Sequence, residues 1–245
     1  MPRDWDATTY DRVADPMTRW GAAVVDRLPL EGHERVLDAG CGTGRVTEQL
    51  AERLPGGTVV ALDGSPAMID EARRRLARFG NRVEFVVGDV LAPLPLAPVD
   101  AILSTATFHW VPDHDALFRN LAAVLRPGGH LVAQCGGTGN IGAIQAVLAT
   151  IGDGWPGDVY FAGPGETRER LLEAGFTDVE AWLQEEPTRF EQGAPFEAYL
   201  RTVVLGSHLA RLPAREHGAF VHEVASRLPA AEIDYVRLNI VARRA

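Results

Sequence analysis

The sequence predicts an α/β fold in which a doubly wound, mostly parallel sheet is covered by helices on both faces. Three observations predict it. Strand and helix patterns alternate five times in the first part of the chain, which is typical of a parallel sheet. A glycine-rich turn joins the first strand to its helix, and acidic residues follow the second and third strands. Because such sheets bind ligands at the carboxyl ends of their strands, these features predict a site along one edge.

The first strand and its turn occupy residues 35 to 44. A short apolar run leads into Asp38-Ala39-Gly40-Cys41-Gly42-Thr43-Gly44, and a helical apolar pattern follows at once. Glycines suit this turn because it requires unusual backbone angles and lets a ligand approach the bare backbone. Arg45 stands where the dinucleotide fingerprint G-x-G-x-x-G has its last glycine. An oxidoreductase that binds NAD through this turn is therefore disfavoured.

The second strand, residues 58 to 63, ends at Asp63, about 20 residues beyond the glycine turn, where a doubly wound fold puts the carboxylate that binds ribose hydroxyls. The alternative is an ordinary turn aspartate at a strand end. Ser65 and Pro66 then favour a helix start, as N-cap and first helical residue, and Met68 lies on the apolar stripe of that helix.

The third and fourth strands are predicted at residues 83 to 88 and 99 to 104, and the fifth at 131 to 135. Phe108-His109-Trp110 follows the fourth strand, before a helix capped by Asp113. His109 is the best-placed candidate for a general base, or else it only lines a pocket or bonds the backbone. Trp110 forms a pocket wall or packs the junction, and His114 is expected at the surface or in the helix cap.

The flanking segments are predicted to be mainly helical. Residues 1 to 33 read as one or two helices, packed on the core or acting as a lid through Tyr10. Residues 136 to 165 are a glycine-rich loop with a short helix. A helix over 166 to 174 and a strand over 179 to 183 follow. Residues 190 to 230 are largely helical, and a last strand covers 235 to 242.

The composition indicates an ordinary globular protein of 245 residues with one domain, or one domain with an insertion. A net charge of −9 disfavours a nucleic-acid partner. The two cysteines have no metal-like spacing, and no apolar segment resembles a signal or a membrane span, so we expect a reduced, cytoplasmic protein. We expect no divalent metal, because the sequence has no carboxylate cluster with ligand spacing near the fourth strand.

Together, four stretches resemble the class I S-adenosylmethionine-dependent methyltransferases, and most closely the trans-aconitate methyltransferase group: Leu37 to Gly44, Asp63 to Ile69, Phe108 to His114, and Ile240 to Arg244. The resemblance implies a seven-stranded, Rossmann-like sheet whose last strand is antiparallel. It also implies an organisation into an N-terminal helical lid (1–33), an α/β core (34–189 and 231–245) and a helical substrate cap (190–230).

The resemblance further implies that S-adenosyl-L-methionine is the cofactor and S-adenosyl-L-homocysteine the product. The expected cofactor-binding residues are Tyr10, Asp38, Gly40, Cys41, Gly42, Thr43, Gly44, Asp63, Gly64, Ser65, Met68, Gly88, Asp89, Val90, Ser104 and Thr105. The expected substrate-binding residues are Trp110, Arg12, Trp20, Arg201 and Arg237, the arginines as partners of a carboxylate.

The predicted function is methyl transfer to a small molecule, either to a carboxylate, as in trans-aconitate, or to a natural-product hydroxyl. A carboxylate nucleophile needs no base, whereas a hydroxyl benefits from one. The alternative is a methyltransferase-fold protein that binds the cofactor for a non-methylating reaction such as cyclisation. We expect a monomer or a homodimer.

Overall fold

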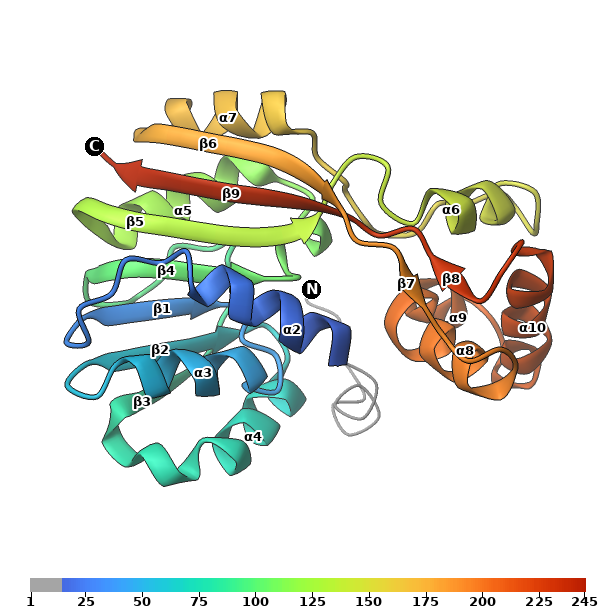
Figure 1. Cartoon of the computed structure of the whole chain (residues 1–245), viewed down its shortest axis with the longest axis horizontal. Helices are drawn as coiled ribbons and strands as arrows, with labels where there is room; N and C mark the ends of the chain where they lie inside the picture. Colours follow the sequence, from blue (N-terminus) through green and yellow to red (C-terminus); the bar gives the residue numbers. More distant parts are fainter. Residues whose placement is uncertain (1–14) are drawn as a thin grey trace.

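The computed structural model describes residues 15–245, with side chains from Trp20 onward. Its centre is a seven-stranded sheet in the order β3-β2-β1-β4-β5-β9-β6 (Figure 1). Neighbouring strands pair in parallel from β3 to β5, whereas β9 runs antiparallel to both β5 and β6. The predicted mostly parallel sheet is confirmed. The strands are β1 (Arg35–Ala39), β2 (Thr58–Asp63), β3 (Val83–Val87), β4 (Val99–Thr105), β5 (Leu125–Gly136), β6 (Phe176–Glu185) and β9 (Val236–Arg244).

Helices cover both faces of this sheet. Successive strand residues point to opposite faces, so Val36 and Leu37 of β1 belong to different hydrophobic clusters. The Val36 cluster packs under α2 (Asp15–Val25), α3 (Arg45–Arg53) and α4 (Pro66–Arg75). The Leu37 cluster packs under α5 (His114–Val124) and α7 (Pro164–Glu173). Short 3-10 turns, η1 (Ala77–Arg82) and η2 (Phe108–Trp110), complete this α/β body.

Two helices begin where their caps predict. The Ser65 hydroxyl accepts the backbone N–H of Met68 at 3.3 Å, with Pro66 as the first helical residue of α4. The Asp113 carboxylate accepts the N–H of Ala116 at 2.9 Å at the start of α5. These caps satisfy donors that a helix start leaves unpaired.

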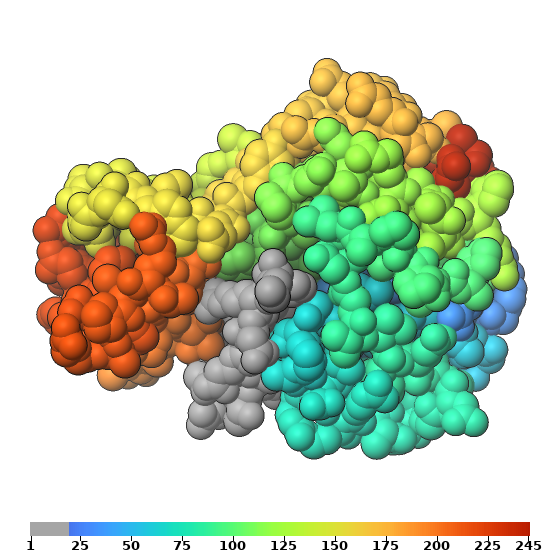
Figure 2. Space-filling model, turned by 180° about the vertical axis from the view of Figure 1, so that it is seen from behind, coloured from blue at the N-terminus to red at the C-terminus, as the bar shows by residue number. Residues whose placement is uncertain are grey.

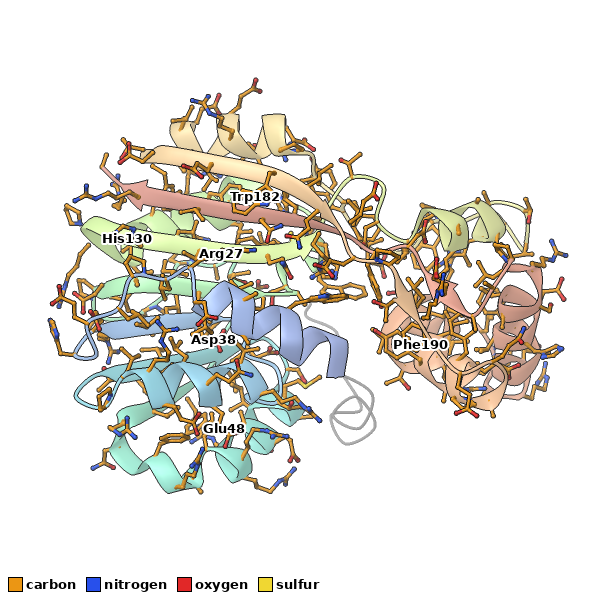
Figure 3. All side chains as sticks on the ribbon, in the orientation of Figure 1. Arg27, Asp38, Glu48, His130, Trp182 and Phe190 are labelled. Carbon is orange, nitrogen blue, oxygen red and sulfur yellow. The ribbon has the colours of Figure 1, made fainter. Side chains whose placement is uncertain are left out.

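A separate group of helices, which we call the helical lobe, lies at one end of the molecule, beyond the carboxyl ends of the strands (Figures 1 and 2). It has its own hydrophobic cluster, which includes Phe196, Tyr199 and Val221. Phe190 lies in this lobe (Figure 3) and packs 4.3 Å from the Tyr199 ring. The lobe consists of α6 (Gly142–Leu148), β7 (Thr188–Arg189), α8 (Ala194–Tyr199), η3 (Leu200–Val204), α9 (Gly206–Ala210), η4 (Ala214–Glu216), α10 (His217–Arg227) and β8 (Glu232–Ile233).

A buried polar contact fixes β9 between its neighbours. The Asn239 side-chain oxygen accepts hydrogen bonds from Gln134 of β5 at 2.8 Å and from Arg27 at 2.5 Å. The Arg27 guanidinium also lies 5.2 Å from the centre of the Trp182 ring of β6 (Figure 3). Since a register slip of one residue would move Asn239 to the other face, this contact specifies the register.

Candidate active site

A cavity of about 1010 Å³ lies between the carboxyl ends of the strands and the helical lobe. Its size is at the upper end of the usual range for ligand sites, so it has room for a cofactor and a second molecule. We refer to it as the cavity. The predicted site residues that line it are Gly40, Gly42, Asp63, Gly64, Met68, Gly88, Asp89, Val90, Thr105, His109, Trp110 and Arg237.

The glycine turn has the backbone that its sequence predicts. Gly40 and Gly42 both adopt positive φ, +84° and +54°. A side chain on Gly40 would lie 2.1 Å from the Thr107 hydroxyl, whereas one on Gly42 would meet no atom within 4 Å. Gly40 is therefore required by packing, and Gly42 leaves open backbone at the cavity.

Asp63 connects the glycine turn to the start of α4. Its carboxylate accepts the N–H groups of Gly42 and Ser65, each at 2.9 Å. Burial raises the pKa of Asp63, and these N–H groups oppose that effect. A carboxylate has about four acceptor positions, so an oriented Asp63 at the cavity wall retains capacity for a diol. This carboxylate acceptor fits the ribose hydroxyls of S-adenosylmethionine.

Asp38 lies beneath this turn and not at the cavity wall. It is fully buried inside the sheet (Figure 3), and one oxygen accepts the Thr47 hydroxyl at 2.7 Å. The other oxygen, Oδ1, has no hydrogen-bond partner in the described part of the chain. Burial raises its pKa from 3.8 to about 7, with a smaller contribution from Asp63 in the same direction.

Several other predicted cofactor residues also lie outside the cavity lining. Ser104 is buried, and its hydroxyl donates to the Ala39 carbonyl at 2.6 Å. Ser65 is occupied as the cap of α4. Their roles as cofactor ligands stay predictions. The remaining members of this group are Cys41, Thr43 and Gly44, which belong to the turn itself.

His109, in η2 after β4, and Arg237, in β9, both line the cavity. His109 sits in η2, and its Nδ1 accepts the backbone N–H of Gly136 at 3.3 Å. Burial, together with the charge of Arg237 and with His114, holds its pKa well below the usual value. A neutral imidazole whose Nδ1 accepts carries its hydrogen on Nε2. His109 is therefore a hydrogen-bond donor through Nε2.

Arg237 is a buried cation at the cavity wall, 3% exposed. Its guanidinium stacks 4.8 Å above the ring of Trp20, a cation–π contact. Trp20 is itself buried and does not line the cavity, and its indole N–H donates to Glu186 at 3.3 Å. Trp20 thus supports Arg237, and its direct contact with substrate stays a prediction.

Two further expectations concern the positions of His114 and Arg201. His114 was expected at the surface or in a cap, and this is wrong, because it is 2% exposed and its Nε2 bonds the Phe108 carbonyl at 3.0 Å. Arg201 is exposed and lies outside the cavity lining. Tyr10 and Arg12 lie outside the described residues.

Arg201 belongs to η3, in which Val203 and Val204 line the cavity and Arg201 does not. This turn is a π-helix, closed by a bond of 2.8 Å from the Leu205 N–H to the Leu200 carbonyl. A π turn changes which side chains share a face, and Val203 and Val204 line the cavity instead. Sequence reasoning gave no role to several other lining residues, namely Thr107, Asn140, Ile141, Gln145, Leu148, Trp155, Asp158, Phe161, His208, Arg211 and Tyr235.

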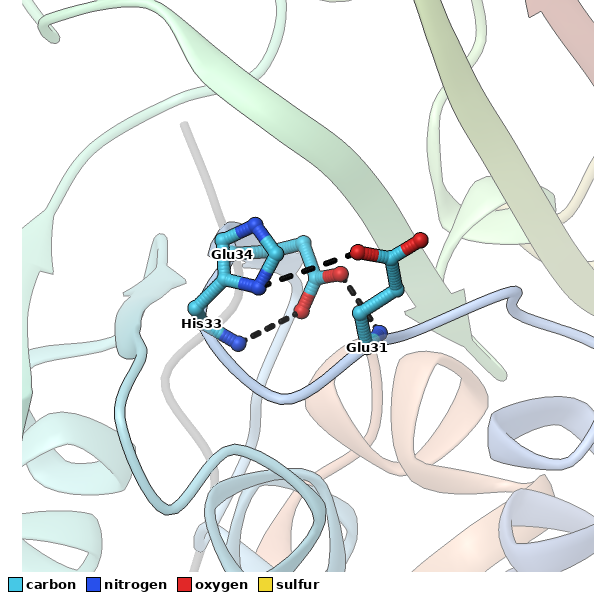
Figure 4. A group of neighbouring side chains, drawn as sticks. All are labelled: Glu31, His33 and Glu34. Atoms are coloured by element: carbon cyan, nitrogen blue, oxygen red, sulfur yellow. Dashed lines mark hydrogen bonds and ion pairs between the residues drawn. The ribbon is translucent and has the colours of Figure 1, made fainter.

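One group with metal-ligand chemistry occurs within residues 15–245, in the loop before β1 (Figure 4). Ligand atoms of Glu31, His33 and Glu34 lie within 4.8 Å of one another. The Glu34 carboxylate already accepts three backbone N–H groups, at 2.6, 2.8 and 3.0 Å. Burial opposes its ionisation, but these N–H groups outweigh that effect and lower its pKa. The group braces a loop at the amino end of the sheet.

Comparison with known proteins identifies the family. A methyltransferase domain model matches residues 36–129. A trans-aconitate 2-methyltransferase of Delftia acidovorans is 31% identical over 98% of both chains. One from Methylobacterium nodulans is 37% identical over 74% of this chain and 67% of the relative. Other relatives match over about half of their length, as in Azoarcus sp., 41% identical over 53% of this chain and 50% of the relative.

Solved structures share the fold. Bacillus subtilis YcgJ has a TM-score of 0.68 at 14% identity, covering 92% of this chain and 98% of that one. Phosphoethanolamine N-methyltransferase 2 of Haemonchus contortus, in complex with S-adenosyl-L-methionine, has a TM-score of 0.67 at 20% identity, covering 97% of this chain and 56% of that one. The [4+2]-cyclase SpnF has a TM-score of 0.62 at 22% identity, covering 93% and 80%.

These findings define an enzyme of the class I S-adenosylmethionine-dependent methyltransferases, with S-adenosylmethionine as its cofactor. Within that class, the chain belongs to the family of the trans-aconitate 2-methyltransferases. Over residues 15–245, no helix is both long and apolar enough to cross a membrane.

Proposed function

We propose that this enzyme transfers the methyl group of S-adenosylmethionine to a carboxylate of a small organic acid. The observation that carries the proposal is the pair formed by His109 and Arg237 at the cavity wall. One is a neutral hydrogen-bond donor and the other a buried cation. Together they suit an anionic acceptor, and the names of the sequence relatives agree with an acid.

The carboxyl edge of the sheet would hold the cofactor. Asp63 would accept the ribose hydroxyls, and the open backbone at Gly42 would lie against the cofactor. Met68, Asp89 and Val90 line the same end of the cavity and would surround the adenine. We also propose that residues 1–33 form a lid and that residues 190–230 form a substrate cap, to which the helical lobe adds α6, β7 and β8.

His109 favours a carboxylate over a hydroxyl acceptor. A general base needs a nitrogen with a free lone pair directed at the acceptor. In His109 the lone pair of Nδ1 accepts the Gly136 N–H, and Nε2 carries the proton. A carboxylate is already ionised at neutral pH and needs no base. The protein then has to align its oxygen with the sulfonium methyl and exclude water.

Calorimetric titration with S-adenosylhomocysteine tests the cofactor half of the proposal. We expect the wild type to bind and Asp63→Ala to lose at least about tenfold in affinity, because a hydrogen-bonded charged acceptor contributes about 1.5–3 kcal/mol. The control is Asp70→Ala, an exposed aspartate on α4. Equal loss in both variants would contradict the assignment of Asp63.

Mass spectrometry of the product tests the acceptor half. The enzyme, with S-adenosylmethionine, should convert carboxylic acids to methyl esters, which alkali hydrolyses back to the acid. Methyl ethers formed from alcohols or phenols, with no ester from any acid, would overturn the proposal.

A further inference from the structure

We infer that the acceptor is a monocarboxylic acid with an apolar acyl or aryl body, and that the helical lobe binds this body. The inference rests on the proposed carboxylate methylation and specifies which acids are used. It comes from the charge, the hydrogen bonding and the apolar surface of the lobe side of the cavity.

The charges along the described lining suit one carboxylate rather than three. Arg237 is the arginine next to His109. The other lining arginine, Arg211, donates to Asp153 at 2.8 Å and stacks 4.2 Å above the Trp155 ring. Asp158 adds a negative charge to the same part of the cavity wall. A second or third carboxylate on the acceptor would meet Asp158 and an arginine that is already paired, at an electrostatic cost.

Three polar side chains of the lobe side each make a hydrogen bond within the protein, although Nδ1 of His208 has no partner among the described residues. Asn140 accepts the Val236 N–H at 2.9 Å, and Gln145 donates to the Pro156 carbonyl at 3.0 Å. His208 bonds the Trp155 carbonyl through Nε2 at 2.9 Å. These groups build the wall, and an acceptor rich in hydroxyls or carboxylates would have to compete with such bonds.

What the lobe presents to the cavity is largely hydrocarbon and aromatic surface. The π turn directs Val203 and Val204 into it, and α6 contributes Leu148. Tyr235 and Trp155 lie in the same wall. Burying an acyl or aryl body here removes apolar surface from water on both partners. The cavity of about 1010 Å³ has room for such a body beside the cofactor.

Initial rates with a series of acids test the inference. The acids are straight-chain monocarboxylates of increasing length, phenyl-substituted acids, succinate and trans-aconitate, at a fixed saturating concentration of S-adenosylmethionine. We expect kcat/KM to rise about two- to fourfold per added methylene until the lobe is filled, since each buried methylene gains about that factor. The kcat/KM of the best monocarboxylate should exceed that of trans-aconitate.

A matched pair of variants assigns the effect to the lobe. Val204→Arg puts a cation into the apolar wall, so it should lower kcat/KM for long and aromatic acids at least about tenfold and abolish the dependence on chain length. Leu172→Arg is the control, because Leu172 is 41% exposed on α7 and outside the cavity lining. S-adenosylhomocysteine binding shows that both variants are folded.

The outcomes separate the inference from the proposed function. If trans-aconitate is the fastest acid and chain length has no effect, the inference is wrong and carboxylate methylation stands. If no acid is methylated although S-adenosylhomocysteine binds, both are wrong. If apolar acids are preferred but Val204→Arg leaves that preference intact, the lobe does not bind the body and the inference fails.

Discussion

At the residue scale, the chemistry of the site depends on which nitrogen of His109 carries a proton. The Gly136 N–H occupies Nδ1, and burial near Arg237 holds the pKa of the ring well below its usual value. The ring is therefore neutral throughout the physiological range and donates through Nε2. An aligned donor of this kind orients an anion without removing a proton from it.

The pH dependence of turnover follows from this protonation state. With cofactor and acid saturating, we expect kcat of the wild type to vary by less than about twofold between about pH 6 and 9, because no essential base titrates there. Stopped assays of methyl-ester formation measure it. A tenfold loss per pH unit below about pH 7 would instead show that an essential group titrates in this range, and would contradict the neutral, non-titrating state of His109.

Asp38 gives a prediction for stability. Burial raises its pKa to about 7 in the folded protein, against about 3.9 in an unfolded chain. Between these values the folded state holds a proton that the unfolded state has lost, so this residue lowers the free energy of unfolding as pH rises from about 4 to 7. Asp38→Asn removes that loss.

We therefore compare the Tm of Asp38→Asn with the Tm of the wild type at two pH values. The difference, variant minus wild type, should be roughly 5 °C larger at pH 8 than at pH 5. Differential scanning calorimetry at both pH values measures it. Asp113→Asn is the control, since asparagine caps α5 as well as aspartate does. A difference that is the same at both pH values would mean that Asp38 is already ionised at pH 5.

At the element scale, the strand-turn-helix unit of β1 and α3 contains two glycines with different duties. A methyl group on Gly40 would collide with Thr107, which in turn bonds the Gly40 and Thr105 carbonyls. A methyl group on Gly42 would enter open space in the cavity. One glycine serves the fold and the other serves the ligand.

Alanine substitutions separate these duties. Gly40→Ala should destabilise the enzyme by about 2 kcal/mol or more through the collision and the positive φ. Gly42→Ala should cost only about 1 kcal/mol but weaken S-adenosylhomocysteine binding. Thermal unfolding and calorimetric titration measure the two effects. Equal loss of binding with unchanged stability in both variants would contradict this division.

Helices, strands and their caps differ in how far the sequence alone predicts them. The strands and caps around Asp63, Ser65 and Asp113 were predictable because alternation, buried apolar runs and capping residues are local signals. The strand order depends on long-range pairing and was not predicted; the resemblance implied only a seven-stranded sheet with an antiparallel last strand. The place of Val203 and Val204 in the cavity wall could not be predicted, because a π turn leaves no sequence pattern that distinguishes it from an α-helix. His114 was misplaced because its partner, the Phe108 carbonyl, exists only once η2 has formed.

At the scale of the whole molecule, the helical lobe and the sheet have separate hydrophobic clusters. The lobe is built from short helices, whereas the central strands are buried on both faces. We expect the backbone amides of α8 and α10 to exchange with deuterium well before those of β1, β4 and β5, because local opening needs less buried surface to be exposed. Hydrogen-exchange mass spectrometry measures it, and equal protection of lobe and sheet would contradict it.

The position of β9 has a consequence for synthesis on the ribosome. β9 is the last strand along the sequence, yet it lies between β5 and β6. Until it emerges, the nascent chain exposes one edge of β5, and β6 has no partner in the sheet. Unpaired edges of this kind invite pairing with other chains. The sheet is therefore complete, and Arg237 reaches the cavity, only after β9 has been synthesised and has paired with β5 and β6.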